Sequence, residues 1–128
     1  MSFEEIELLR KRAEAFLRNA LYLVSENEAD LAMFNLEQYC QLILKHKLLV
    51  IKGTYPRTHS LRQLIRELGE ENPKMLILIN DVRNLHYIAR IEEAYISSRY
   101  LPFKYTLEEV KDISRFVLEV FKPLVDSV

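Results

Sequence analysis

The segment from Ala29 to Lys52 constrains the fold most, because its apolar side chains cover two faces of one predicted helix. Both faces follow the helical repeat: Ala32, Leu36, Tyr39, Ile43 and Val50 form the first, and Met33, Cys40, Leu44, Leu48 and Ile51 form the second. A helix that is apolar over this much of its circumference is buried on more than one side. We therefore expect it both at the centre of a helical bundle and at a subunit interface.

The rest of the chain is also predicted to be helical. The 128 residues include only two glycines and four prolines, which is too little turn-forming material for a β-rich domain. Apolar residues recur at helical spacing near 3–25, 60–68 and 73–98, and in a last segment behind the capping box Thr106–Glu109. The predicted fold is all-α, an up-and-down helical bundle of four long helices plus one short helix, in a single domain over residues 1–128.

The second half of the chain contains two predicted irregularities. An unbroken helix from Pro73 towards Ser98 would be about 40 Å long at 1.5 Å per residue. Polar residues interrupt its pattern and leave room for a local distortion: Arg83, Asn84, His86 and Arg90. Residues 99–105 are predicted to form a non-helical aromatic connector, because Pro102 disfavours helix at the residue before it.

Composition also excludes several classes of site. The single cysteine, Cys40, rules out an internal disulfide and a multi-cysteine metal site. None of the three histidines has carboxylates at metal-ligand spacing, so we expect neither a metal nor another cofactor. No signal peptide or membrane-spanning apolar run is visible, so we expect a cytoplasmic protein with no membrane association.

Positive charge is concentrated between Glu37 and Glu67, where the chain has no Asp or Glu. Six basic residues lie in this stretch: Lys45, Lys47, Lys52, Arg57, Arg62 and Arg66. The whole chain carries a formal charge of only −1, so the excess is local and predicts an anion-binding surface rather than tight nonspecific duplex binding.

A predicted turn at Gly53–Pro56 lies within this stretch, and a helix restarts behind Ser60. The first amide groups of that helix suit an anion. Lys45, Arg57 and His59 are the candidate phosphate-binding residues on this side, together with Gln38, seven residues before Lys45 on one helical face. For His59 we favour the alternative that it braces the loop against the bundle.

Two further pairs in the second half could act on a nucleotide. Arg99 could bind a phosphate while Tyr100 stacks on a base; alternatively, Arg99 caps the end of its helix and Tyr100 packs on the core. Arg83 and His86 share one helical face at i, i+3 spacing. They could act in RNA cleavage as phosphate stabiliser and general acid or base, or make ordinary polar contacts.

The order of these motifs resembles the HEPN family, the higher-eukaryote and prokaryote nucleotide-binding domains. The resemblance is carried by NLEQYCQLILKHKLL (35–49), YPRTHSLRQL (55–64) and the pair Arg99-Tyr100, and it covers about residues 4–125. It implies a helical bundle that pairs as a homodimer. Small prokaryotic members often bind a minimal nucleotidyltransferase in toxin–antitoxin-like pairs, and some members are metal-independent endoribonucleases.

The endoribonucleases of this family carry an Arg with a His four to six residues later. Here His86 follows Arg83 by only three positions, and no His follows Arg99. The leading hypothesis is therefore a nucleotide- or RNA-phosphate-binding domain, with little or no enzymatic activity, that partners a minimal nucleotidyltransferase. The alternatives are a divergent endoribonuclease using Arg83 and His86, and a purely structural protein-interaction adaptor.

Overall fold

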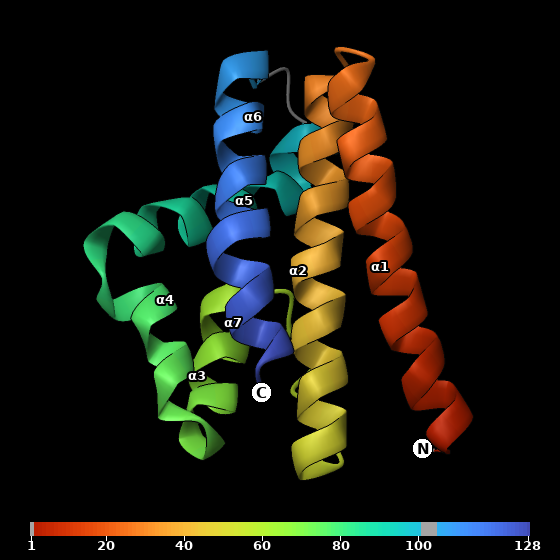
Figure 1. Cartoon of the computed structure of the whole chain (residues 1–128), viewed down its shortest axis with the longest axis vertical. Helices are drawn as coiled ribbons and strands as arrows, with labels where there is room; N and C mark the ends of the chain where they lie inside the picture. The colour runs from red at the N-terminus through yellow and green to blue at the C-terminus, as the bar shows by residue number, and fades with distance from the viewer. Residues whose placement is uncertain (1, 101–104) are drawn as a thin grey trace.

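A hairpin of two long helices forms the axis of the molecule. The computed structural model describes residues 2–100 and 105–128, without the side chain of Arg99. Helices α1 (Phe3–Ser25) and α2 (Ala29–Lys52) run antiparallel along each other (Figure 1). Ala13 and Ala20 of α1 are fully buried, and their small side chains allow the two backbones to approach closely. Both helices have the bounds that the apolar periodicity predicts.

Seven further elements follow. They are α3 (Leu61–Glu71), the 3₁₀-helix η1 (Pro73–Leu76), α4 (Ile77–Asn80), α5 (Val82–Tyr100), α6 (Leu107–Phe116), the π-helix η2 (Val117–Phe121) and α7 (Lys122–Asp126). Elements α6, η2 and α7 form one continuous helical run beside α2, whereas α5 lies across the bundle behind it (Figure 1). The described residues form helices and no strand, so the predicted all-α fold is confirmed. The arrangement differs from the predicted four long helices plus one short helix, because η1 and α4 are additional short elements and α5 crosses the bundle instead of running up or down along it (Figure 1).

Helix α2 occupies the centre of this bundle. It contacts α1, α3, α5, α6 and α7, and residues of both of its apolar faces are buried, including Leu36, Cys40 and Leu44. The ring of Tyr39 meets Phe121 edge-on, with 5.9 Å between ring centroids. The prediction of a central helix is therefore confirmed.

Local sequence signals set several helix ends. Gly53, at the start of the predicted turn, ends α2 in the left-handed region with φ 78°, the conformation of a C-terminal capping glycine. Ser60 and Thr106 start their helices by accepting hydrogen bonds from the backbone N–H groups of Gln63 and Glu109.

Helix α3 continues past its predicted end at Leu68. Gly69 lies inside it, where a Cβ atom would come within 2.5 Å of a Leu76 methyl carbon, so this glycine permits close packing instead of ending the helix.

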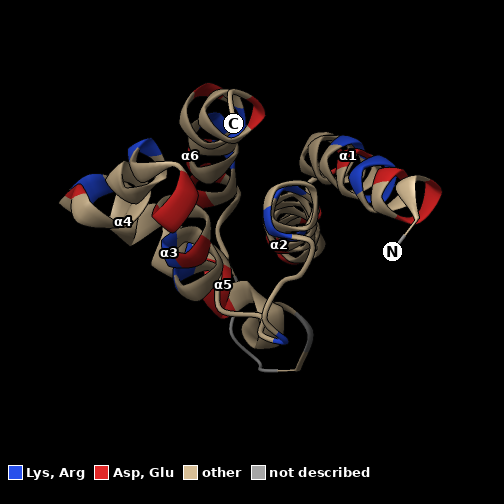
Figure 2. Ribbon diagram, turned by 90° about the horizontal axis from the view of Figure 1, so that it is seen from below, with Lys and Arg blue, Asp and Glu red and all other residues tan. Residues whose placement is uncertain are grey.

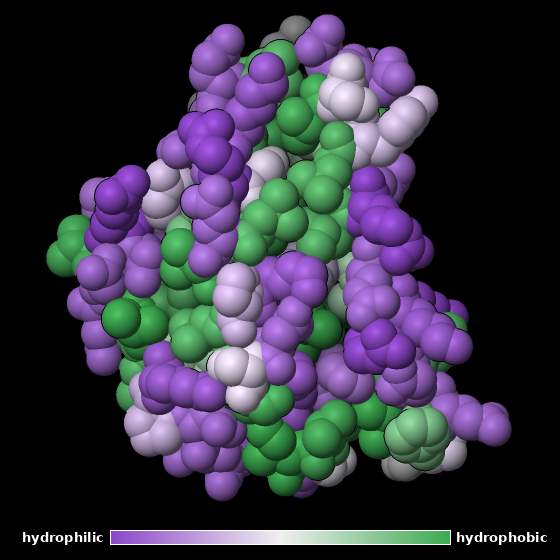
Figure 3. Space-filling view, in the orientation of Figure 1, coloured by the Kyte–Doolittle hydropathy of each residue, from purple (hydrophilic) through white to green (hydrophobic). Residues whose placement is uncertain are grey.

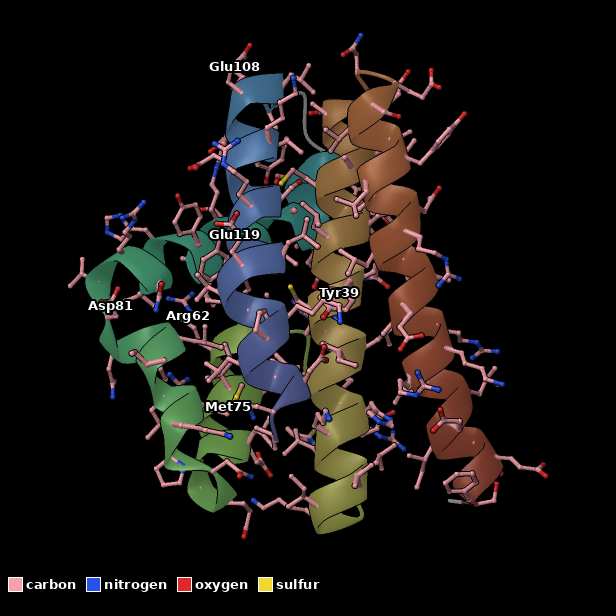
Figure 4. The ribbon with its side chains drawn as sticks, in the orientation of Figure 1. Tyr39, Arg62, Met75, Asp81, Glu108 and Glu119 are labelled. Atoms are coloured by element: carbon pink, nitrogen blue, oxygen red, sulfur yellow. The ribbon has the colours of Figure 1, made fainter. Side chains whose placement is uncertain are left out.

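The predicted helix over 73–98 is broken at Asp81. Asp81 is extended, with φ −81° and ψ 124°, and its carboxylate accepts a hydrogen bond of 2.9 Å from the backbone N–H of Asn84. The Asn84 side chain donates to the carbonyl of Ile77 at 3.2 Å. Asp81 therefore starts α5 in a new direction at the corner seen in Figure 4.

The end of α5 also differs from the prediction. Arg99 and Tyr100 belong to this helix, although they were expected in the connector. The remainder of that predicted connector, apart from Tyr105, lies outside the described residues.

The last helix contains a π-helical turn. The backbone N–H of Lys122 donates to the carbonyl of Val117, five residues back. Pro123 explains this widening, because it has no N–H and its ring crowds the carbonyl of Glu119. As a result, three consecutive residues, 118–120, are exposed.

Across the described residues, no helix combines the length and the apolar character needed to span a membrane.

Candidate functional site

Two of the six basic residues in the acid-free stretch, Lys52 and Arg62, form ion pairs with carboxylates from other parts of the chain. The Nζ atom of Lys52 lies 2.8 Å from a carboxylate oxygen of Glu70. Lys47 donates to the carbonyl of Val128 at 3.0 Å. Figure 2 shows Lys and Arg interspersed with Asp and Glu over the helices. The broad anion-binding surface expected from the sequence is therefore reduced to a smaller region.

The expected anion site at the start of α3 is occupied by a side chain of the protein. One oxygen of Glu92, on α5, accepts hydrogen bonds from the Ser60 hydroxyl at 3.2 Å and from the backbone N–H of Arg62 at 3.1 Å. Its other oxygen accepts from the Arg62 guanidinium at 2.8 Å, and Arg62 lies between α3 and α5 (Figure 4). Burial raises the pKa of Glu92, but these hydrogen bonds outweigh burial and hold its pKa below the ordinary value. The helix terminus is not free for a ligand, which corrects the prediction.

Three of the predicted binding residues come together in one depression. We call it the cationic hollow, and it has a volume of about 340 Å³. Its lining residues are Gln41, Lys45, Tyr55, Arg57, Thr58, His59 and Tyr95. None of these described lining residues is acidic. The hollow thus brings two basic side chains, Lys45 and Arg57, to one place, and its described lining includes no carboxylate.

Lys45 is held in this hollow by neutral groups. Its Nζ donates to the side-chain oxygen of Gln41 at 2.9 Å and lies 5.2 Å from the ring centroid of Tyr55. Burial lowers the pKa of Lys45, and the charge of Glu37 opposes this shift. Because the contacting partners carry no negative charge, the ammonium charge remains available to an anion.

Arg57 and His59 reach the hollow from the loop between α2 and α3. The backbone N–H of Thr58 donates to the carbonyl of Pro56 at 2.9 Å, which puts Arg57 at the tip of a tight turn. Arg57 is exposed and makes no ion pair within residues 2–100 and 105–128. His59 stacks on Tyr95 of α5, with 4.1 Å between ring centroids and 14° between planes. This contact braces the loop, as we favoured, and His59 also lines the hollow.

Gln38 was predicted beside Lys45, but Gln41 is the glutamine that lines the hollow. Gln38 does not line the hollow; its amide donates to buried Glu37 at 2.7 Å. Gln41 also donates to Glu37, at 2.8 Å, and accepts from Lys45. The i, i+4 spacing of Glu37, Gln41 and Lys45 was the available signal. Tyr95 carried no such signal, because α5 lies far from the loop in sequence.

Of the other predicted binding pair, the structure describes only the side chain of Tyr100. Arg99 and Tyr100 lie at the end of α5. The side chain of Arg99 lies outside the described part of the structure, and Tyr100 is 69% exposed. Tyr100 therefore does not pack on the core, and it is not among the residues that line the hollow.

Arg83 and His86 line a different depression, which we call the α5–α6 cleft. Its volume is about 500 Å³. Its acidic lining residues are Glu93, Glu109 and Asp112, and its remaining polar ones include Tyr87 and Arg90.

Contacts within the cleft already engage several of these groups. The Tyr87 hydroxyl donates to Asp112 at 2.6 Å, and its ring stacks on Phe116 with 4.6 Å between centroids. Arg90 pairs with both oxygens of Glu109, at 2.7 and 3.0 Å. The three carboxylates make this cleft less favourable for a phosphate than the cationic hollow.

The fold and the hollow define a class: an all-helical domain built on a long hairpin, with a small cationic site beside the loop that follows it. The family model for the HEPN domain matches residues 6–128. The chain therefore belongs to the HEPN family, which makes it a helical, nucleotide- or RNA-related domain. A search of curated proteins found no significant match.

Proposed function

We propose that this HEPN domain binds the phosphate of a nucleotide or of RNA in the cationic hollow. The observation that carries the proposal is the convergence of Lys45, Arg57 and His59 on one depression whose described lining residues include no acidic side chain. Elsewhere in the basic stretch the charges of Lys52 and Arg62 are neutralised by nearby carboxylates.

Each of the three side chains supplies a different contact. Arg57 can bind two phosphate oxygens with its planar guanidinium. Lys45 adds a compact charge from the partly buried side of the hollow. The ring of His59 offers a donor and, with Tyr95, an aromatic surface next to the phosphate.

We extend the proposal to the partners. Membership of the HEPN family supports a role beside a minimal nucleotidyltransferase in a toxin–antitoxin-like pair, and homodimer formation. Apolar side chains visible between α6 and α1 (Figure 3) supply surface for such contacts. Exposed Leu21 of α1 and Leu31 of α2 are apolar residues of this hairpin that remain accessible.

The endoribonuclease alternative is kept for one reason: Arg83 and His86 line the same cleft. It requires RNA cleavage without added metal that His86→Ala abolishes while the protein stays folded. The carboxylates that line the cleft repel a phosphate group, so we favour phosphate binding in the cationic hollow over RNA cleavage in the cleft. The adaptor alternative requires that no phosphate ligand stabilises the chain and that a partner protein does.

Thermal unfolding with added ligand tests the proposal. We would measure the unfolding temperature with inorganic pyrophosphate, nucleotides and short RNAs, for the unchanged chain, Arg57→Ala and the control Arg66→Ala. Arg66 is also an exposed arginine but does not line the hollow. A ligand at a hundred times its dissociation constant adds about 2.7 kcal/mol of stability.

We expect this gain to be lost in Arg57→Ala and kept in Arg66→Ala. If no ligand stabilises the chain, or if both variants respond like the unchanged chain, the cationic hollow is not the binding site.

A further inference from the structure

A second hollow adjoins the cationic one. Its volume is about 360 Å³, and His59 and Tyr95 line both depressions. The stacked rings of these two residues are therefore a wall shared by both hollows. A molecule whose phosphate lies against Lys45 and Arg57 can extend past this wall, and cavities of this combined size suit small ligands.

The lining of the second hollow differs from that of the first. Ala89 and Ile96 give it an apolar part, and Glu92 and Glu93 give it carboxylates. Across the two hollows, the basic side chains of the first can bind a phosphate. The shared aromatic wall and the apolar part of the second can contact a base, and the carboxylates of the second can accept hydrogen bonds from it. This sequence of chemistry matches a nucleotide whose base carries a hydrogen-bond donor.

Of the two carboxylates, Glu93 is the one with accepting capacity to spare. Glu92 is engaged by Ser60 and Arg62 through both of its oxygens. Glu93 accepts a hydrogen bond from Arg90 on Oε2, at 2.9 Å, and its side chain is 60% exposed. Its Oε1 receives no hydrogen bond from any residue that the structure describes. An ionised carboxylate has several further acceptor positions.

We propose that the second hollow takes a nucleobase with an exocyclic amino group, which donates to Glu93. The site then prefers cytosine and adenine nucleotides to those of uracil and hypoxanthine, whose carbonyl group at the same position would face the carboxylate. This inference rests on the proposed function, because the phosphate held at Arg57 sets where the base lies. Glu93 discriminates by attraction of one base and repulsion of the other.

Cytidine and uridine monophosphate are the sharpest probes, because their bases have the same ring and differ only at C4, where an amino group replaces a carbonyl, and at the adjacent N3, which carries a proton only in uracil. We would titrate each into the full chain by calorimetry, with inorganic pyrophosphate as a probe that lacks a base. We expect cytidine monophosphate to bind about tenfold more tightly than uridine monophosphate, the ratio that one charge-assisted hydrogen bond at an exposed position can supply.

The variant Glu93→Gln keeps the shape of the side chain and can donate to a uracil carbonyl. We expect the preference to fall below about twofold in this variant, with pyrophosphate affinity unchanged. Arg90 retains its pairing with Glu109 in this variant. Glu108→Gln is the matched control, an exposed glutamate of α6 outside both hollows (Figure 4), and it should keep the full preference.

The outcomes separate the two proposals. Equal affinities for the two nucleotides, or a preference that persists in Glu93→Gln, would overturn the base specificity. If the unchanged chain still binds pyrophosphate in that case and Arg57→Ala does not, the proposal that phosphate binds in the cationic hollow stands. If pyrophosphate and both nucleotides fail to bind, or bind equally well to Arg57→Ala, the proposed function itself is wrong.

Discussion

The carboxylate of Glu92 accepts a hydrogen bond from the backbone N–H of Arg62, 3.1 Å away, and so caps the first turn of α3 from a different helix. It also pairs with the Arg62 guanidinium at 2.8 Å. Thirty residues separate the two positions in sequence. Three residues further along α5, Tyr95 stacks on His59. Helix α5 therefore fixes the loop that presents Arg57 and His59 to the cationic hollow.

Replacing Glu92 by Gln should destabilise the chain by about 1–2 kcal/mol, because the charge-assisted hydrogen bonds at the start of α3 would be weakened. Urea unfolding measures this loss. Glu70→Gln is the control: Glu70 is paired with Lys52 but its side chain is 67% exposed, so the variant should cost less than about 0.5 kcal/mol. Equal effects of the two substitutions would contradict the special role of Glu92.

Ionisation of Glu92 should make the stability of the chain depend on pH. The pKa of Glu92 in the folded state lies below its ordinary value of 4.5, so folding favours the ionised form. Its contribution is complete above about pH 4.5 and is lost as the pH falls through the lower folded-state pKa.

Urea unfolding from about pH 6 to about pH 3 checks this sign. The stability difference between the unchanged chain and Glu92→Gln should shrink as the pH falls. A difference that stays constant or grows would contradict the pKa direction.

Removing the hydroxyl of Tyr39 should leave stability unchanged or raise it by up to about 1 kcal/mol. This hydroxyl is buried and has no hydrogen-bond partner within the described ranges 2–100 and 105–128. Tyr39→Phe keeps the edge-on contact with Phe121, whereas Tyr39→Ala should cost about 3–5 kcal/mol by leaving a cavity. Chemical denaturation compares the three proteins. A loss of more than about 1 kcal/mol in Tyr39→Phe would mean that the hydroxyl is satisfied in solution.

Replacing Gly53 should destabilise the chain only through the strain of its backbone conformation, because an added side chain would meet no neighbouring atoms. A Cβ atom added there meets no heavy atom within 4 Å, but φ is +78°, a conformation that L-residues other than Asn and Asp rarely adopt. We expect Gly53→Ala to lose about 1 kcal/mol in thermal unfolding and Gly53→Asn to lose less. If alanine were as stable as glycine, the end of α2 would have to relax away from the left-handed cap.

The sequence by itself determined α1, α2 and the starts of α3 and α6. Apolar periodicity located α1 and α2, and the caps at Gly53, Ser60 and Thr106 act within a few residues of themselves. The double apolar face of α2 was sufficient to predict a central helix, because burial on several sides requires apolar residues on several sides. The break at Asp81 and the π-helix ahead of Pro123 also have local causes. Each depends on one residue inside a segment whose apolar periodicity is helical throughout, so the periodicity alone predicted a continuous helix.

Only the tertiary structure decided which charges remain available. The acid-free stretch ceases to be acid-free once Glu70 and Glu92 fold against Lys52 and Arg62. Likewise, the His59–Tyr95 stack exists because α5 turns across the bundle at Asp81. Electrostatic and stacking interactions depend on distance in space and not along the chain. For that reason the basic residue types were readable from the sequence, whereas the grouping of Lys45, Arg57 and His59 into one hollow required the fold.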